Sequence, residues 1–319
     1  MQQAMAVDSM GLGMNTNIEY RVYGNNAQKA LIFGKVEVAR LENLLSRFLP
    51  DSEISRINEN AGIRSVKVSN EVYEVLSNAI RFFDISQGLF DVTISPLIDL
   101  WDYKHASVAP EEQQIQKVRS LINSRDIVLN PHKRTAKLQR QRQSIDLGGI
   151  GKGFASDRFI KILKENDIKS AFINIGGNIS TLGKKPDGTP WRVGIRHPRR
   201  EGCLLGAVEV TGLAVVTSGD YERFFIDQDG NRRHHILNPK IGYPAMSGLI
   251  SVTIITDSAI VADALSTTVF IAGLENGLKI LTQFPEVAAI LVDEYQTIYI
   301  TQKLNDSFLT TSDNKVKLI

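Results

Sequence analysis

Four glycines and a lysine stand together in the stretch SIDLGGIGKGFASDRF, residues 144–159. Glycine has no Cβ atom, so its backbone can come close to a ligand. An amphipathic run follows, so free N–H groups at the start of a helix would face this glycine loop, and Lys152 adds a positive charge. This combination is typical of a loop that binds an anionic ligand. The alternative is a plain turn between a strand and a helix, with a lysine on the surface.

The stretch matches neither of two common nucleotide motifs. A Walker-type loop needs Ser or Thr after its Gly-Lys pair, where this chain has Gly153. The dinucleotide fingerprint fits Gly149 and Gly151, but Phe154 stands in place of its third glycine. Asp146 precedes the loop and has the wrong charge for a phosphate. We therefore interpret Asp146 as an acceptor of a hydrogen bond from a ligand ring or hydroxyl.

A candidate metal site lies in the segment VADALSTTVF, residues 261–270. Asp263 and Thr267 are four positions apart, so on a helix they share one face. A carboxylate and a hydroxyl offer the oxygen ligands that suit Mg²⁺. The alternative is that Thr267 bonds to its own helix and Asp263 lies on the exposed edge.

The segment HHILNPKIGYPA carries two adjacent histidines, His234 and His235, beside Asn-Pro and Gly-Tyr-Pro turns. The sequence offers no His-x-x-x-His pair and no cysteine partner for zinc, because Cys203 is the single cysteine. That count also excludes a disulfide within the chain.

The elements that position these residues are intermixed helices and short strands. Residues 25–48, 69–86, 151–166 and 257–273 have helical patterns, whereas residues 170–177, 191–198, 249–256 and 287–293 are predicted to be strands. In the second helix Val72, Val75, Leu76, Ala79, Ile80 and Phe83 form one apolar stripe after a cap at Ser69 or Asn70. Residues 204–227 read as a hairpin. Regular alternation of strand and helix is lacking, which predicts an α+β fold with largely antiparallel sheets and packed helices.

Length and composition set further limits. The 319 residues are expected to form a single domain, 1–319, and 43% of them are hydrophobic. A net charge of +2 is nearly balanced and argues neither for a nucleic-acid groove nor for a membrane surface, so we expect no nucleic-acid partner. We expect no transmembrane segment, because no apolar run reaches roughly 18 residues. The first residues lack a secretory pattern, so a cytoplasmic location is expected for the sequence as written, and an exported one if the N-terminus was trimmed.

Taken together, eight segments resemble the ApbE family of flavin transferases. They are GMNTNIEYRVYG, LPDSEISRIN, GLFDVTISPLIDLW, IDLGGIGKGFASD, FINIGGNISTLG, VVTSGDYERFF, HHILNPKIGYP and ADALSTTVFIAG, which run in this order from about Met14 to about Gly273. The resemblance implies an α+β fold with an FAD cleft between lobes, and Mg²⁺ as cofactor.

The resemblance also implies roles for individual residues. Asp263 and Thr267 match side-chain metal ligands, and Gly149 and Ser266 match further ligands through backbone carbonyls. His235, and not His234, matches the functional histidine. The positions that match contacts to FAD are Met14, Phe48, Leu89, Phe90, Asp91, Asp146, Lys152 and Ile236. Phe48 departs from the family, because many relatives have Tyr there, so the ring is kept and a hydroxyl hydrogen bond is lost.

The implied function is an FAD:protein FMN transferase. It would cleave the pyrophosphate of FAD, attach FMN by a phosphoester bond to a Thr or Ser hydroxyl of an acceptor flavoprotein, and release AMP. The acceptor would be a subunit of a redox complex or a reductase. Two alternatives stay open at this point: a Mg²⁺-dependent FAD pyrophosphatase that gives FMN and AMP, and a non-catalytic flavin-binding protein.

Overall fold

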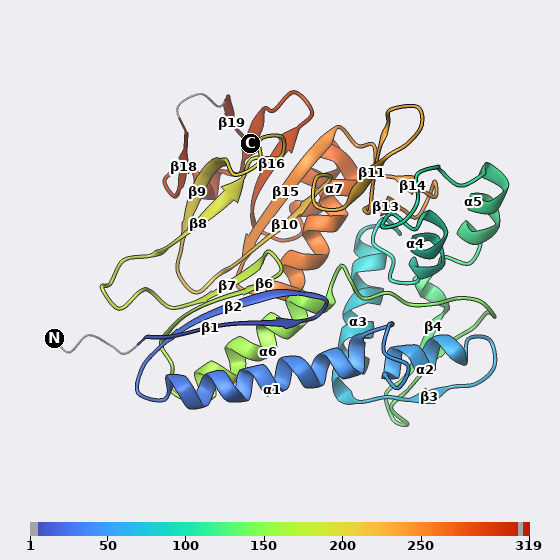
Figure 1. Cartoon of the computed structure of the whole chain (residues 1–319), viewed down its shortest axis with the longest axis horizontal. Helices are drawn as coiled ribbons and strands as arrows, with labels where there is room; N and C mark the ends of the chain where they lie inside the picture. Colours follow the sequence, from blue (N-terminus) through green and yellow to red (C-terminus); the bar gives the residue numbers. More distant parts are fainter. Residues whose placement is uncertain (1–5, 312–314) are drawn as a thin grey trace.

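A nine-stranded sheet forms the centre of the protein in the computed structural model, which describes residues 6–311 and 315–319 (Figure 1). In the described part of the chain, all neighbouring strands pair antiparallel except β17 and β19. The predicted α+β fold with largely antiparallel sheets is therefore confirmed. In spatial order the strands are β1 (Ala6–Gly13), β2 (Thr16–Tyr23), β6 (Ser170–Ile175), β7 (Asn178–Leu182), β10 (Ala214–Gly219), β15 (Leu249–Thr256), β16 (Ala288–Asp293), β17 (Ile298–Ile300) and β19 (Val316–Leu318).

Helices cover one face of this sheet and a small second sheet covers part of the other. The helices that pack on it are α1 (Ala27–Leu45), α6 (Gly151–Glu165) and α7 (Ala259–Leu281). The second sheet consists of β8 (Trp191–Arg196), β9 (Leu204–Val210) and β18 (Phe308–Thr310). Its apolar side chains, such as Trp191 and Val208, pack with Val215 and Ile290 of the large sheet in a core separate from the one under the helices.

Helix α7 meets the length and mean hydropathy of a membrane span, which the expectation from the sequence did not include. However, 67% of the 18-residue apolar segment of α7 is buried inside the fold. Buried Asp263 also interrupts its apolar surface. We therefore interpret α7 as a core helix.

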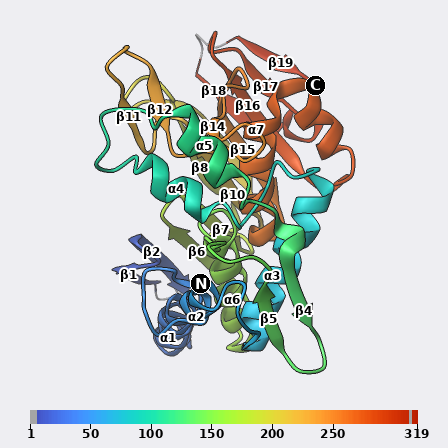
Figure 2. The ribbon, with the colours of Figure 1, turned by 90° about the vertical axis from the view of Figure 1, so that its right-hand side faces the viewer.

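A third group of elements lies beside the sheet, shown on the right of Figure 1. It contains α2 (Glu53–Glu59), β3 (Val66–Lys67), α3 (Asn70–Ile85), α4 (Ser95–Trp101), α5 (Glu112–Arg119), β4 (Ile127–Asn130) and β5 (Thr135–Leu138). Short 3₁₀ helices are η1 (Ser124–Asp126) and η2 (Gln302–Leu304). Two small hairpins, β11 (Phe224–Ile226) with β12 (Arg232–His234) and β13 (Leu237–Asn238) with β14 (Tyr243–Pro244), lie near α4 and α5 (Figure 2).

Two sequence-based predictions are wrong in detail. On α3, which the Ser69 hydroxyl caps, the fully buried ring is Phe82 and the Phe83 ring is only half-buried. Residues 204–227 do not form one hairpin, because β9 pairs with β8 and β18 whereas β10 pairs with β7 and β15. The turn between β9 and β10 therefore carries the chain from the small sheet to the large one.

Candidate active site

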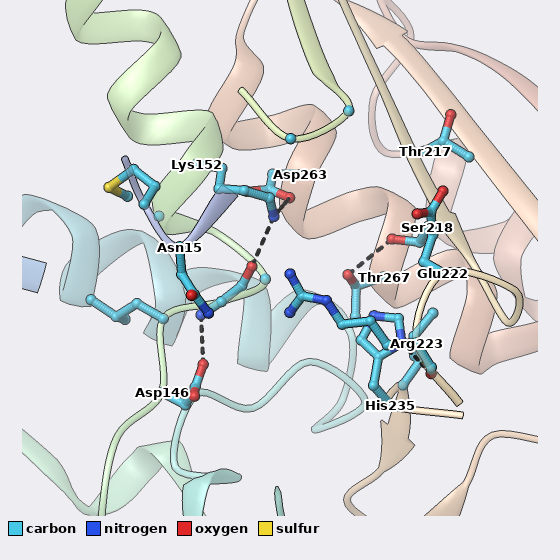
Figure 3. A pocket seen from close by; sticks show the side chains of 18 of the residues that line it. Asn15, Asp146, Lys152, Thr217, Ser218, Glu222, Arg223, His235, Asp263 and Thr267 are labelled. Atoms are coloured by element: carbon cyan, nitrogen blue, oxygen red, sulfur yellow. Dashed lines mark hydrogen bonds and ion pairs between the residues drawn. The ribbon is translucent and has the colours of Figure 1, made fainter. Parts of the chain in front are cut away.

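A cleft of about 380 Å³ brings together segments that are far apart in the sequence. Every predicted site residue lines it except Ser266, which is fully buried. The residues that line it are Met14, Phe48, Leu89, Phe90, Asp91, Asp146, Gly149, Lys152, His235, Ile236, Asp263 and Thr267. The described residues thus place the glycine loop, the Asp263 helix and the second histidine around one space (Figure 3).

The glycine loop lies directly against the Asp263 helix. A Cβ atom on Gly149 would stand 3.2 Å from the Phe90 ring and 3.7 Å from Oγ1 of Thr267. A Cβ atom on Gly153 would stand 2.3 Å from the carbonyl oxygen of Ala259, a distance that no side chain tolerates. Gly153 therefore allows α6 and α7 to approach closely, whereas Gly149 leaves room for the Phe90 ring.

Two carboxylates tie α6 and α7 together in a reciprocal way. The backbone N–H of Gly153, at the start of α6, donates to Oδ2 of Asp263 at 2.9 Å. In return, the Asp157 carboxylate of α6 accepts from the N–H groups of Ala259 and Ile260 at the start of α7, at 2.8 and 3.0 Å. Each carboxylate thus faces the positive end of the other helix. Burial raises the pKa of Asp157 in spite of these bonds.

The second oxygen of Asp263 faces the cleft and Lys152. Nζ of Lys152 lies 3.7 Å from Oδ1 of Asp263 and donates to the carbonyl of Gly148 at 3.1 Å. The Asp263 side chain is only 5% exposed. One N–H donor and one distant ammonium compensate this buried charge incompletely, so the site favours a further cation.

Hydroxyl groups surround the same point. Oγ of Ser218, from β10, lies 2.9 Å from Oγ of Ser266 and 3.2 Å from Oγ1 of Thr267. The Ser266 hydroxyl also donates to the carbonyl of Asp263, so its side chain is committed within the protein. A metal role for Ser266 through its carbonyl stays a prediction.

The donor set fits a hard cation and not a zinc-type site. Among the described residues no group of three or more His, Cys, Asp and Glu side chains is placed to hold a metal. Instead one carboxylate, Asp263, stands beside the Thr267 hydroxyl and the backbone of Gly149. Mg²⁺ takes few protein ligands, prefers oxygen and keeps several waters, so this set suits it.

Asp146 is held by an arginine that the sequence analysis did not include. Its Oδ1 accepts from the N–H of Gly148 at 2.7 Å, and its Oδ2 lies 2.6 Å from Nε of Arg47. Arg47 also pairs with Asp99 of α4 at 2.8 Å and stacks on Phe48, with 4.6 Å from its Cζ to the ring centroid. Arg47 therefore joins the C-terminal end of α1, helix α4 and the glycine loop.

Asp91 lines the cleft but its carboxylate serves the fold. It accepts hydrogen bonds from the Thr93 and Ser124 hydroxyls, both at 2.6 Å, and from the backbone N–H groups of the same residues. Burial nevertheless raises its pKa. The contact to FAD predicted for residues 89–91 stays a prediction; all three residues line the cleft, and the side chains of Leu89 and Phe90 are apolar.

The adjacent histidines have different surroundings. His234 is buried, packs edge-on against Phe270 and has Nε2 3.0 Å from the carbonyl of Ala245. His235 lines the cleft, and its Nδ1 lies 3.2 Å from the carbonyl of Arg223. Desolvation, followed by the charge of Arg223, lowers the pKa of His235 to about 3. A neutral His235 that donates Nδ1–H to this carbonyl keeps a lone pair on Nε2.

Comparisons with known proteins show the family of this chain. A family model described as the ApbE family matches residues 14–291. An FAD:protein FMN transferase of Klebsiella pneumoniae is 34% identical over 266 residues, which cover 83% of this chain and 82% of the relative. One from Treponema pallidum is 33% identical over 303 residues, covering 88% and 83%.

Solved structures agree with these relatives. The ApbE protein of Thermotoga maritima matches with a TM-score of 0.86 and 29% identity, over 94% of this chain and 98% of the other. The flavin transferase ApbE of Vibrio cholerae matches with a TM-score of 0.86 and 25% identity, over 95% and 99%.

Proposed function

The chain belongs to the ApbE family and is a flavin transferase, and from that premise we propose that it moves FMN from FAD to a Thr or Ser hydroxyl of an acceptor protein with Mg²⁺. The hydroxyl oxygen forms a bond to the phosphorus of the FMN half. The bond from that phosphorus to the bridging oxygen breaks, and AMP leaves. The observation that carries the proposal is the convergence of Asp263, Thr267, the glycine loop and His235 on one cleft.

The inner end of the cleft would bind the pyrophosphate. Asp263 and Thr267 would hold Mg²⁺ with side-chain oxygens, and Gly149 and Ser266 are proposed to add backbone carbonyls. When bound, Mg²⁺ supplies positive charge to the phosphate oxygens. Lys152, at the start of α6, adds a second positive charge from the chain itself. The N-terminal end of α6 faces the same point, which favours an anion.

His235 is proposed to take the proton of the incoming hydroxyl. Its lowered pKa keeps the ring neutral at pH 7, and the hydrogen bond of Nδ1 to the Arg223 carbonyl leaves Nε2 as the acceptor. The same bond holds the ring orientation. A neutral histidine with one fixed tautomer can accept a proton at Nε2 once a hydroxyl lies within hydrogen-bond reach, and the low pKa makes it a weak base that favours passing the proton on.

Apolar side chains would hold the ring systems of FAD. Met14, Leu89, Phe90 and Ile236 line the cleft. Phe48 is 64% exposed, and Cζ of Arg47 and Nζ of Lys104 lie 4.6 and 5.9 Å from its ring centroid. The exposed part of this ring would contact a flavin or adenine ring. Asp146 would accept a hydrogen bond from the ligand only with the part of its carboxylate that Arg47 and Gly148 leave accessible.

The deciding experiment incubates the protein with FAD, Mg²⁺ and a candidate acceptor, either a redox-complex subunit or a reductase with an acceptor Thr. Mass spectrometry of the acceptor and chromatography of AMP are the two readouts. An FMN adduct together with AMP supports the proposal. AMP and FMN without an adduct, also when the acceptor is omitted, would indicate a pyrophosphatase. Bound FAD without any AMP would indicate a flavin-binding protein and contradict the proposal.

A further inference from the structure

Three arginines among the described residues line the cleft, and one of them has no carboxylate partner in that part of the chain. Arg47 pairs with Asp99 and Asp146, and Arg196 has Nη1 3.4 Å from Oε1 of Glu222. Arg223 forms no ion pair with any residue that the structure describes. Its guanidinium points into the middle of the cleft, with Thr267 and His235 on one side and Lys152 on the other (Figure 3). This arginine therefore offers its full set of donors to whatever enters.

The short segment around Arg223 fixes where this guanidinium lies. The carbonyl of Arg223 accepts from the backbone N–H of His235 at 3.0 Å and faces Nδ1 of the same residue at 3.2 Å. Phe225, two residues on, packs against the apolar cluster of Leu97 and Trp101. The backbone that carries Arg223 is thus anchored on both sides, and its position is coupled to that of His235.

A guanidinium in such a place needs an anion from the substrate. Arg presents parallel N–H groups that match two phosphate oxygens, whereas Lys acts as a point charge. The nearby ammonium of Lys152 is already shared with Asp263 and the Gly148 carbonyl. Of the described cations that line the cleft, Lys104 and Arg223 form no ion pair; Nζ of Lys104 lies over the Phe48 ring at 5.9 Å from its centroid, whereas Arg223 lies beside His235 and Thr267.

We propose that Arg223 is a catalytic residue that binds non-bridging oxygens of the phosphoryl group in transfer, on the side of the cleft that also carries His235. This assignment rests on the proposed function. Negative charge on these oxygens and on the departing AMP phosphate shifts as the P–O bond breaks, and a preoriented guanidinium stabilises that charge distribution more than the ground state. Removal of Arg223 should therefore lower turnover more than it weakens FAD binding.

The experiment compares Arg223→Ala and Arg223→Lys with the wild type and with Arg232→Ala. Arg232 is a matched control. It lies on β12, which pairs with the strand β11 that follows Arg223, it stacks on Phe224 with 3.7 Å from its Cζ to the ring centroid, and it does not line the cleft. FAD affinity is measured from flavin fluorescence, and AMP release at saturating FAD, Mg²⁺ and acceptor gives the turnover. Arg223→Ala should lose about 100-fold or more in turnover. Its FAD dissociation constant should change far less.

Two further measurements, on Arg223→Lys and on rescue by free guanidinium, separate the loss of the paired donors from a loss of folding. Arg223→Lys should fall between the wild type and Arg223→Ala, since it keeps the charge and loses the paired donors. Guanidinium chloride below denaturing concentrations should restore part of the turnover of Arg223→Ala and leave Arg232→Ala unchanged. If Arg223→Ala does not fold, Arg223→Lys alone decides, and wild-type turnover of that variant would overturn the proposal.

The outcomes separate this inference from the function on which it rests. A wild type that releases no AMP would contradict the proposed function itself. An active wild type with equal turnover in Arg223→Ala would overturn the role of Arg223 alone. A loss confined to FAD affinity, with normal turnover at saturation, would also overturn it, because Arg223 would then bind substrate without acting in the transition state.

Discussion

The two walls of the cleft are built in different ways. The inner wall consists of α6 and α7, whose starts are joined by Asp157 and Asp263 and whose backbones nearly touch at Gly153. The outer wall carries Arg223 and His235 beside a small hairpin with exposed Phe224 and Ile226. One wall is part of the protein core, and the other is held by a few backbone hydrogen bonds and one apolar cluster.

This difference suggests a division of labour. A buried carboxylate is costly unless donors and cations surround it, so the cation site requires the packed helix pair. An acceptor protein must bring its hydroxyl to the reacting phosphorus from outside, so the proton acceptor belongs on an accessible element. The substitutions below test whether the inner wall determines the binding of metal and phosphate and the outer wall determines turnover.

The largest effect is expected at the inner wall, for Asp263→Asn. The amide oxygen can still accept the Gly153 N–H, so the fold should persist, but the negative charge for the cation is lost. Mg²⁺-dependent AMP release should fall by about 10³-fold, which corresponds to several kcal/mol of charge stabilisation. Asp257→Asn is the control, since Asp257 is exposed just before the same helix. Activity of Asp263→Asn equal to that of the control at every Mg²⁺ concentration, including subsaturating ones, would remove the metal assignment.

The inner wall is also the part that the sequence predicts best. The four-residue spacing of Asp263 and Thr267 and the glycines before Lys152 are local patterns, and local geometry alone puts each set on one face. That the two sets meet depends on the packing of α6 on α7. The resemblance to a family, and not the pattern, supplied this step.

Other features depend on long-range partners and escaped the sequence. Arg223 and Arg196 look alike in the sequence, and only the fold shows that one has a carboxylate neighbour. The pattern of residues 204–227 is that of a hairpin, but a local pattern does not show which strands become neighbours. The sequence therefore did not predict that β9 belongs to the small sheet and β10 to the large one. On α3, Phe82 and Phe83 both lie near the edge of the apolar stripe, so the pattern does not decide which ring is buried. Phe82 is the buried one because its ring packs against Phe90 and Phe284.

The second effect contrasts the adjacent histidines of the outer wall. His235→Asn should bind FAD within a few-fold of the wild type and lose about 100-fold or more in transfer, as expected for removal of a general base. His234→Asn should instead lower the free energy of unfolding by about 1 to 3 kcal/mol, because a buried polar contact to Ala245 is disturbed. Denaturant titration and single-turnover transfer on each variant measure both quantities. Loss of FAD binding in His235→Asn would make His235 a binding residue.

The third effect concerns pH. The pKa of His235 in the folded protein is about 3, below the roughly 6.5 of an unfolded chain, so the unfolded state binds more protons between these values. The free energy of unfolding should therefore fall as the pH is lowered from 7.5 to 5, with about 1 to 2 kcal/mol of the loss due to His235. Urea titrations of the wild type and His235→Asn at both pH values measure this difference. Equal losses in the two proteins would show that the imidazole is not held neutral.

The smallest effect is expected for Lys152→Gln. A role in binding and a role in turnover predict different results for this substitution. If the inner wall binds the pyrophosphate, the loss should appear in FAD affinity, and turnover at saturating FAD should change little. The Lys152 side chain is 25% exposed and already shared with Asp263, so its charge is partly screened. The dissociation constant for FAD is therefore expected to rise about five-fold, which corresponds to a loss of ~1 kcal/mol in binding free energy. Lys161→Gln is the control, because Lys161 lies on the solvent side of the same helix. A loss in turnover that matches Arg223→Ala, with unchanged affinity, would place Lys152 with the outer wall and contradict the division between binding and turnover.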